Sequence, residues 1–337
     1  MRFGLLSLGD FVPAPGSDQP PLSEAERHRQ CVRLCIAADA LGFDLAWLGE
    51  HHLNDYIVSA PQVLLGAVAA RTQRIRLGTG LTLLPTLDPL LVAEQFATLD
   101  VLSEGRVEFC IGRGIVNSTY ADFGFDIAQS NELMDEKTEL LLRLLRGETL
   151  DWQGRFRSPL QGARLRPLPQ QRPHPPVWMG GGRSEHTLQL AARFGLPLVV
   201  PGIFAPPRAF VPMVARFRDL WRCAGRDPAD LRLGLVAHCH VRDDIEDVHA
   251  FWAPYRNQYQ SWISRMIYGA ERPQPPTPDG PDFYGSPAQV ASRIDEARTL
   301  LGIDTLFLKF DGGGVPEPAI LKAMETFATR VMPRFRG

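Results

Sequence analysis

The sequence contains one stretch in which three titratable side chains directly follow a short apolar run. Residues 45–48 are apolar and of strand length, and the chain then continues through Gly49 into Glu50, His51 and His52. A carboxylate beside two imidazoles can hold or move a proton, because the unperturbed pKa of histidine is about 6.5. The same pattern also occurs where a strand simply ends and its histidines satisfy local hydrogen bonds. The surrounding elements must decide between these two interpretations.

A glycine run followed by two hydroxyl side chains forms a second candidate site. Gly180–Gly182 and Arg183 come after an apolar run, and Ser184 then begins a helical pattern with Thr187 on its first turn. Glycines let backbone N–H groups approach an anion, and the amino end of a helix attracts negative charge. A loosely packed loop with an ordinary serine N-cap would have the same sequence. The run is therefore a candidate phosphate site.

Arg113 lies between Gly112 and Gly114 at the end of another apolar run, 107–111. A guanidinium binds phosphate through two hydrogen bonds. If the two runs are neighbouring strands, Arg113 and the helix start at Ser184 converge on one anion. Two independent features at one place favour an anion site more than either does alone.

Two glycines interrupt the strand-like run 75–84, at Gly78 and Gly80, and Leu81 follows them. Glycine inside a strand marks a close approach of a ligand, or a bulge that lets a sheet bend and close. Both interpretations stay open from the sequence.

Two further histidines, His238 and His240, are two residues apart, so both point to one side of a strand. Together with His51 and His52 they have the residue types of a metal site. No acidic residue accompanies them at a convincing ligand spacing, so we predict that the protein has no metal site.

The composition narrows the class of protein. The chain has 337 residues with 36 Lys+Arg against 38 Asp+Glu, and this balance of charge excludes a general nucleic-acid binder. Its five cysteines show no disulfide spacing, which favours a reducing cytoplasm. The amino terminus turns polar by Asp10, too early for a signal peptide, and no apolar run has transmembrane length. We expect a cytoplasmic protein without a membrane partner.

Short apolar runs alternate with helical patterns along the whole chain. The expected strands are 3–8, 45–49, 75–84, 107–111, 177–179, 196–200, 231–241 and 305–310. The expected helices are 23–41, 61–71, 90–102, 132–146, 184–194, 207–224, 286–301 and 318–332, and a further helix is expected from about residue 244, before a proline-rich segment. Such alternation predicts an α/β fold with a parallel sheet, and eight units predict a (β/α)8 TIM barrel, with an open doubly wound sheet as the alternative.

We expect one domain over 1–337, with insertions at the carboxyl face of the barrel. These are about 115–131, about 150–176 with a hairpin near 152–156, and a lid-like loop at about 254–284 that contains a proline-rich segment. Barrel active sites lie at the carboxyl ends of the strands, which is where every candidate residue above falls.

In combination, these fragments resemble the bacterial luciferase-like flavin monooxygenases. The matching fragments are Gly42-Phe43-Asp44 with Trp47 and Glu50-His51-His52, Leu77-Gly78-Thr79-Gly80, Pro85-Thr86 with Pro89, Leu99-Asp100 with Ser103, Gly105 and Arg106, Gly112-Arg113-Gly114, Gly180–Ser184 with Thr187, and Gly195-Leu196-Pro197. Each fragment is weak alone, but their common order and spacing cover most of the chain. The family fold is a (β/α)8 barrel.

The resemblance implies a cofactor and roles for individual residues. FMN, in its reduced form as a cosubstrate, would have its phosphate held by Arg113, Ser184 and Thr187. Gly80-Leu81 would be a non-proline cis peptide against the flavin ring, with Gly112, Gly182 and Arg183 also at the cofactor. His51 would be the catalytic base, with Glu50 tuning it and His52 beside it. The 254–284 loop would close over the site.

The resemblance also implies partners, and the chain departs from the luciferase subunit in two places. A separate flavin reductase, a small and mostly apolar aldehyde- or ketone-like substrate, and a homodimer formed through barrel helices such as 61–71 are expected. Gly112 stands where luciferase has a reactive cysteine and Arg183 where it has a glutamate, which argues against light emission. The alternatives are a deazaflavin-dependent dehydrogenase, a non-catalytic flavin-binding protein and a metal-dependent hydrolase. Glu50-His51-His52 follows the oxygen-using branch, which favours FMN over deazaflavin.

Overall fold

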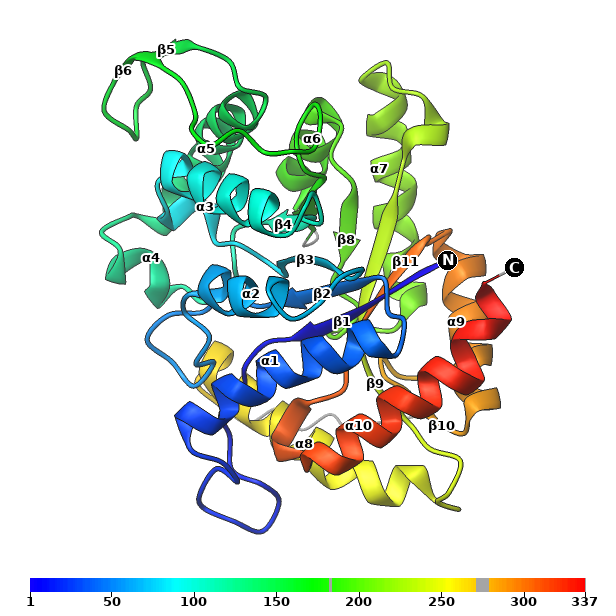
Figure 1. Cartoon of the computed structure of the whole chain (residues 1–337). Coiled ribbons are helices and arrows are strands. Elements are labelled where there is room, and N and C mark those ends of the chain that lie inside the picture. The colour runs from blue at the N-terminus through cyan, green and yellow to red at the C-terminus, as the bar shows by residue number, and fades with distance from the viewer. Residues whose placement is uncertain (182–183, 271–278, 337) are drawn as a thin grey trace.

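Eight parallel strands surround a central axis in the computed structural model, which describes residues 1–181, 184–270 and 279–336 (Figure 1). The barrel strands are β1 (Arg2–Ser7), β2 (Leu45–Leu48), β3 (Arg76–Thr79), β4 (Phe109–Ile111), β7 (Val177–Gly180), β8 (Leu198–Val200), β9 (Leu233–Val241) and β11 (Thr305–Lys309). They pair in the order β3-β2-β1-β11-β9-β8-β7-β4, and every pairing is parallel. The predicted (β/α)8 barrel is confirmed.

The barrel closes between β3 and β4 through two isolated bridges, Leu77 with Val107 and Thr82 with Ile111. Gly78 lies at this seam. A Cβ atom on Gly78 would stand 1.9 Å from the carbonyl oxygen of Glu108 on the opposite side. Only glycine allows the two backbones to approach this closely, so the closure of the barrel explains Gly78 without a ligand.

Helices cover the outside of the barrel. They are α1 (Glu24–Ala40), α2 (Pro61–Ala69), α3 (Pro89–Leu102), α5 (Ser130–Leu145), α6 (Glu185–Phe194), α7 (Val211–Cys223), α9 (Pro287–Leu301) and α10 (Glu317–Thr326). The predicted helix starts after Ser23 and Ser286 are confirmed, since each hydroxyl accepts a hydrogen bond from the backbone three residues on, at Glu26 and Gln289. None of the described helices is long and apolar enough to span a membrane.

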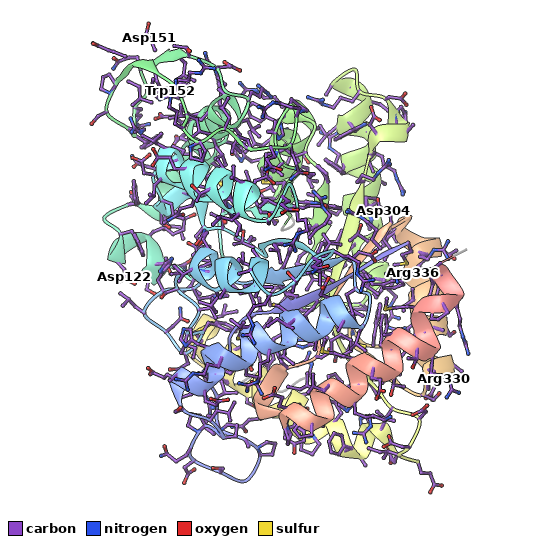
Figure 2. All side chains as sticks on the ribbon, viewed as in Figure 1. Asp122, Asp151, Trp152, Asp304, Arg330 and Arg336 are labelled. Atoms are coloured by element: carbon purple, nitrogen blue, oxygen red, sulfur yellow. The ribbon has the colours of Figure 1, made fainter. Side chains whose placement is uncertain are left out.

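The insertions lie in different places. The 115–131 segment forms a short helix, α4 (Ser118–Asp122), at the carboxyl face as expected. The 150–176 segment contains the predicted hairpin, built from β5 (Leu150–Trp152) and β6 (Leu160–Ala163). Figure 2 labels Asp151 and Trp152 on this outlying hairpin. At its tip the Arg155 N–H donates to Glu136 on α5 over 2.7 Å, so the insertion covers the outer helices, and the prediction that it borders the carboxyl face is wrong.

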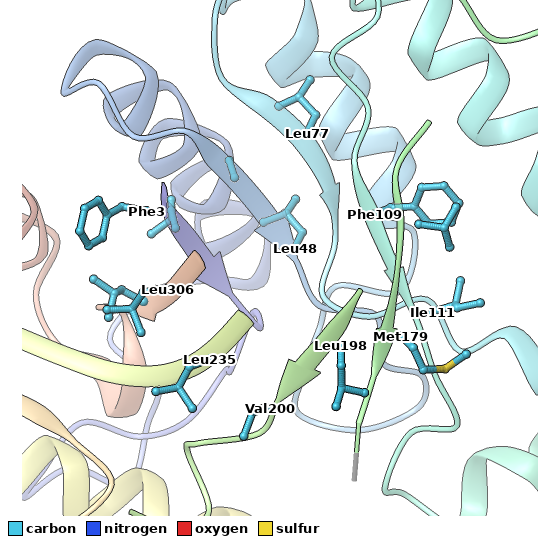
Figure 3. Packing of buried hydrophobic residues seen from close by; sticks show 14 of the residues in the cluster. Phe3, Leu48, Leu77, Phe109, Ile111, Met179, Leu198, Val200, Leu235 and Leu306 are labelled. Carbon is cyan, nitrogen blue, oxygen red and sulfur yellow. The ribbon is translucent and has the colours of Figure 1, made fainter. Parts of the chain in front are cut away.

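Side chains along each barrel strand alternate between two cores. The outward set packs against the helices (Figure 3), and its labelled members are Phe3, Leu48, Leu77, Phe109, Ile111, Met179, Leu198, Val200, Leu235 and Leu306. The inward set fills the barrel with large rings, among which Trp47 and Phe307 stack at 3.8 Å. Gly4 makes room for them, because its Cβ would stand 2.6 Å from Phe307. This packed interior is the floor on which the site is built.

A long helix, α8 (Val248–Tyr268), covers part of the barrel mouth. The helix expected from about residue 244 is therefore confirmed. It extends to Tyr268, so the expected lid-like loop at 254–284 is helical in its first part. A short additional strand, β10 (Phe283–Gly285), lies at the end of the 254–284 segment. It pairs with β9 and was not predicted. The proline-rich residues 271–278 lie outside the described residues.

Candidate cofactor and substrate site

A cavity of about 530 Å³ opens at the carboxyl ends of β2, β3, β4, β7 and β8. The predicted site residues that line it are Glu50, His51, Gly80, Leu81, Arg113, Ser184 and Thr187. Gly112 lies directly beside it, His52 does not line it, and Gly182 and Arg183 lie outside the described residues. Its size suits a ligand larger than a single ring.

One end of the cavity has the character of an anion site. Arg113 Nη1 donates to Ser130 Oγ and Asn131 Oδ1, each over 3.2 Å, and no carboxylate of the described chain forms an ion pair with it. Ser184 is the N-cap of α6, yet its hydroxyl makes no capping hydrogen bond. Thr187 is buried on the first turn of the same helix. A guanidinium, two hydroxyls and a helix start therefore face one space with hydrogen-bonding capacity left over.

The wall between the two ends is made by the Gly80–Leu81 peptide, which is cis as the resemblance predicts. A Cβ on Gly80 would stand 3.0 Å from Trp47 in the barrel floor. Leu81 inserts between the ends of β4 and β7, where a Cβ on Gly112 or Gly180 would come within 2.7 or 2.5 Å of its methyl group. Gly112 therefore has a packing role here, which accounts for the absence of a cysteine at this position.

His51 faces the cavity from the other side. Its ring lies 4.1 Å from the ring of Tyr56 at an angle of 25°, and its buried Nδ1 has no hydrogen-bond partner among the described residues. Burial lowers the pKa of His51 to about 3, and the neighbouring His52 and Lys309 act in the same direction. His51 is therefore a neutral imidazole at physiological pH, able to donate one hydrogen bond and to accept another.

Glu50 interacts with His52 rather than with His51. His52 Nε2 lies 3.0 Å from Glu50 Oε1, whereas the buried Glu50 Oε2 has no hydrogen-bond partner among the described residues. Burial raises the pKa of Glu50, and His52 opposes that rise. Glu50 also lines the cavity itself, so the expectation that it tunes His51 is corrected: Glu50 is a second titratable group at the same wall.

Comparison with known proteins agrees with this geometry. The family model described as luciferase-like monooxygenase matches residues 1–305. The chain belongs to the luciferase-like monooxygenase family. It is 30% identical to limonene 1,2-monooxygenase from Rhodococcus erythropolis, over 99% of this chain and 88% of that protein. The predicted family and the prediction of a luciferase-like oxidoreductase are confirmed.

Solved structures of similar fold include enzymes that differ in cofactor. Monooxygenase RslO1 from Streptomyces bottropensis aligns with a TM-score of 0.87 at 26% identity, covering 99% of this chain and 100% of that one. The oxygenating constituent of 3,6-diketocamphane monooxygenase from Pseudomonas putida, in complex with FMN, gives 0.81 at 17% identity, covering 99% and 98%. An F420-dependent secondary alcohol dehydrogenase gives 0.74 at 18% identity, covering 100% and 99%. The last two likenesses concern the fold alone.

This luciferase-like monooxygenase also has a buried charged cluster that the sequence analysis missed. Lys309 Nζ lies 2.5 Å from Asp10 Oδ1 and 3.0 Å from Asp311 Oδ1, and Arg27 Nη2 lies 2.7 Å from Asp311 Oδ2. Ser7 Oγ donates to the same Asp311 oxygen over 2.5 Å. Burial opposes the charged form of Lys309, yet Asp10 and Asp311 raise its pKa. A lysine inside an apolar strand, with a carboxylate two residues on, was the available sequence signal.

His238 and His240 lie under α8, away from the cavity. The His238 ring is 4.8 Å from Tyr259, and His240 stacks on Phe251 at 5.3 Å. Burial lowers the pKa of His240 to about 4. Within the described residues, no group of three or more histidine, cysteine or acidic side chains is arranged to hold a metal ion. The described residues therefore offer no set of metal ligands that would support the metal-dependent hydrolase alternative.

Proposed function

We propose that this protein is a monooxygenase that uses reduced FMN and O2 to oxidise a small, mostly apolar, aldehyde- or ketone-like substrate. One observation carries the proposal: a single cavity has an arginine without a carboxylate partner at one end and a neutral, unpartnered imidazole at the other, among the residues that the structure describes. These two ends match the two needs of a flavin oxygenase, which are an anchor for a phosphate and a group that handles a proton.

The residues present fit an FMN. Arg113, Ser184 and Thr187 have hydrogen-bonding capacity for a phosphate, and the cis Gly80–Leu81 peptide offers a flat, apolar wall. Gly182 and Arg183 are proposed cofactor-binding residues from the sequence pattern. Reduced FMN supplies the two electrons and activates O2 for transfer of one oxygen atom. The sequence Glu50-His51-His52, which follows the oxygen-using branch in the family resemblance, supports the choice of FMN over deazaflavin.

His51 and Glu50 are the proposed proton-handling groups. The neutral His51 ring can donate a hydrogen bond to a carbonyl oxygen and take up a proton when negative charge on its partner favours the imidazolium. Glu50, paired with His52, lines the same cavity. Apolar side chains, including Ile115, Ile203 and Phe204, line the rest of the cavity and limit the access of water.

The remaining partners are proposals of the same kind. No dinucleotide fingerprint occurs in the sequence, so a separate reductase would supply the reduced flavin. A homodimer through α2 and α3 is supported by exposed apolar residues, of which Val63 is 72% and Leu102 is 65% exposed, and sedimentation velocity would test it. Five free cysteines, four of them buried, suit a cytoplasmic location.

Anaerobic spectral titration tests the proposal. We expect the protein to bind reduced FMN at least about tenfold more tightly than reduced deazaflavin. After admission of O2 with a neutral ketone or aldehyde, we expect an oxygenated product, and we expect His51→Ala to abolish it while flavin binding persists.

The possible results separate the rival functions. Preference for deazaflavin, with reversible hydride transfer and no O2 consumption, would establish the dehydrogenase instead. FMN binding with turnover that His51→Ala leaves unchanged would contradict the role of His51. FMN binding without any turnover would indicate a non-catalytic flavin protein, and binding of neither cofactor would overturn the proposal.

A further inference from the structure

Within the described residues, the His51 ring makes no hydrogen bond that could orient it. Its backbone N–H donates to the Val58 carbonyl over 3.0 Å, but its buried Nδ1 has no partner among the described residues. A catalytic imidazole normally has one nitrogen held by a carboxylate or carbonyl, which fixes its tautomer and direction. In this protein Glu50, the adjacent carboxylate, is bonded to His52 instead. Packing must therefore aim His51.

Tyr56 supplies that packing. Its ring stacks on His51 at 4.1 Å, and its hydroxyl lies 2.5 Å from the hydroxyl of Tyr259 on α8. Trp262, one turn further along α8, meets the Tyr56 ring edge-on at 4.5 Å and 76°. Tyr56 is 1% exposed, so its ring is enclosed by His51 on one face and by α8 residues around it. A phenol anchored at its oxygen and along its ring cannot turn without moving its partners.

Helix α8 is itself fixed to the barrel. Arg256 forms a buried ion pair with Asp282 over 2.9 Å, and Trp262 Nε1 donates to Asp55 over 3.2 Å. Gly313 passes so close beneath the helix that a Cβ there would stand 1.9 Å from the Tyr255 carbonyl oxygen. The Lys309 ammonium lies 5.0 Å from the centre of the Tyr259 ring. The described part of α8 is therefore a rigid support rather than a moving cover.

We propose that Tyr56 and Tyr259 are positioning residues that hold the His51 ring in its direction toward the cavity. Tyr56 acts by stacking, and Tyr259 acts through the hydroxyl of Tyr56. The effect of these tyrosines on catalysis rests on the proposed function, whereas their effect on the orientation of the His51 ring does not depend on it. Helix α8 then has a defined role. Its residue Tyr259 contacts Lys309 of the buried charged cluster on one side and the Tyr56 hydroxyl on the other, and Tyr56 in turn holds His51.

Four variants test the proposal. Tyr56→Leu removes the stack, Tyr56→Phe and Tyr259→Phe each remove the same hydrogen bond, and the double phenylalanine variant loses no interaction beyond that one. Tyr255→Phe is the matched control, because Tyr255 is on the same helix and no hydrogen bond of its hydroxyl occurs within the described residues. We expect kcat to fall on the order of 100-fold in Tyr56→Leu, while the Kd for flavin stays within about twofold.

The smaller variants give the sharper test. Tyr56→Phe and Tyr259→Phe should each lower kcat by about two- to tenfold, and the double variant should equal either single one, because they share one interaction. Additive losses, or an equal loss in Tyr255→Phe, would contradict the proposal and indicate a general effect on folding.

NMR of the histidine rings in the protein without flavin keeps this test separate from the proposed function. The His51 ring protons, assigned by their loss in His51→Ala, should carry the ring-current shift of Tyr56 at pH 7. Tyr56→Leu should abolish that shift, Tyr56→Phe and Tyr259→Phe should reduce it, and Tyr255→Phe should preserve it. Unchanged His51 resonances in Tyr56→Leu would overturn the proposal whether or not the protein binds FMN.

Discussion

The mouth of the barrel has two halves whose buried polar groups differ in their surroundings. In the half bordered by β2, β3, β4, β7 and β8, Arg113 has no carboxylate partner, and Glu50 Oε2 and His51 Nδ1 are unpartnered among the described residues. In the half under α8, Lys309 and Asp311 are deeply buried, but partners surround both of them. Burial and charge are therefore common to both halves. The first differs because Arg113, Glu50 and His51 line the cavity, whereas the groups under α8 do not.

This difference separates a binding site from a structural core. An unpartnered polar atom is informative where it faces space, as His51 does. His240 shows that a missing partner alone does not identify a binding site. Both of its ring nitrogens lack partners among the described residues, yet it is stacked on Phe251 and does not line the cavity. The half whose unpartnered groups line the cavity can bind a ligand, whereas the ion-paired cluster of Lys309, Asp311 and their partners stabilises the barrel around it.

The largest effect should come from disrupting the ion-paired cluster under α8. Lys309→Met removes one of the two cations that the buried Asp10 and Asp311 share and leaves only Arg27, and we expect a loss of about 3–5 kcal/mol in the free energy of unfolding, measured by urea denaturation. Lys322→Met is the control, because the exposed Lys322–Glu325 pair should contribute less than about 1 kcal/mol. A Lys309→Met protein as stable as the control would show that the cluster is not a structural anchor.

Arg113→Met should weaken the binding of FMN and leave the free energy of unfolding unchanged, unlike Lys309→Met. We expect the Kd for FMN to rise about 10- to 100-fold, since charge-assisted hydrogen bonds contribute about 1.5–3 kcal/mol, while binding of riboflavin, which has no phosphate, stays unchanged. Isothermal titration with both ligands measures the ratio. Arg157→Met, on the outlying hairpin, is the matched control. Equal losses for both ligands would place the phosphate elsewhere.

A third effect concerns pH. Because the folded-state pKa of His51 is lowered to about 3, the unfolded chain binds a proton below about pH 6.5 that the folded chain does not. Stability contributed by neutral His51 is therefore present above that pH and is lost as the pH falls toward 3, with a slope of at most about 1.4 kcal/mol per pH unit. Asp311, whose pKa is lowered by Lys309 and Arg27 against the effect of burial, adds its own loss below about pH 4.

His51→Phe should remove only the first of these losses. Urea denaturation between pH 7 and 4 should show a shallower decline in stability for this variant than for the parent protein. Parallel declines would mean that His51 is not held neutral by burial.

Much of the fold could be predicted because the relevant signals are local. Alternating apolar runs and helical patterns specified the eight barrel strands, and each candidate residue followed one of them. Which of His51 and His52 faces the cavity could not be predicted, because adjacent residues of an extended chain point to opposite sides. The role of Tyr56 was equally hidden, since its partner Tyr259 is 203 positions away and only packing joins them.

The wrong predictions have physical causes. The lid-like loop at 254–284 was expected because the family resemblance implies a loop over the site at the proline-rich segment. The structure continues the helix through Pro254, and the burial of Tyr259 and Trp262 against the barrel mouth accounts for its stability. The 150–176 insertion was expected at the carboxyl face, whereas its contacts, such as that to Glu136, place it along the outside of the barrel.

The β3–β4 seam has a consequence for how stability depends on the cofactor. Two isolated bridges join these strands, and the cavity is lined by Leu81 and Leu83 on one side of the seam and by Arg113 on the other. A ligand that contacts both sides would link them as a strand pairing does elsewhere in the barrel. Binding to the folded state alone adds about 2.7 kcal/mol when the ligand is present at 100 times its Kd. A flavin bound in this cavity would thus stabilise the closed barrel in addition to taking part in the reaction.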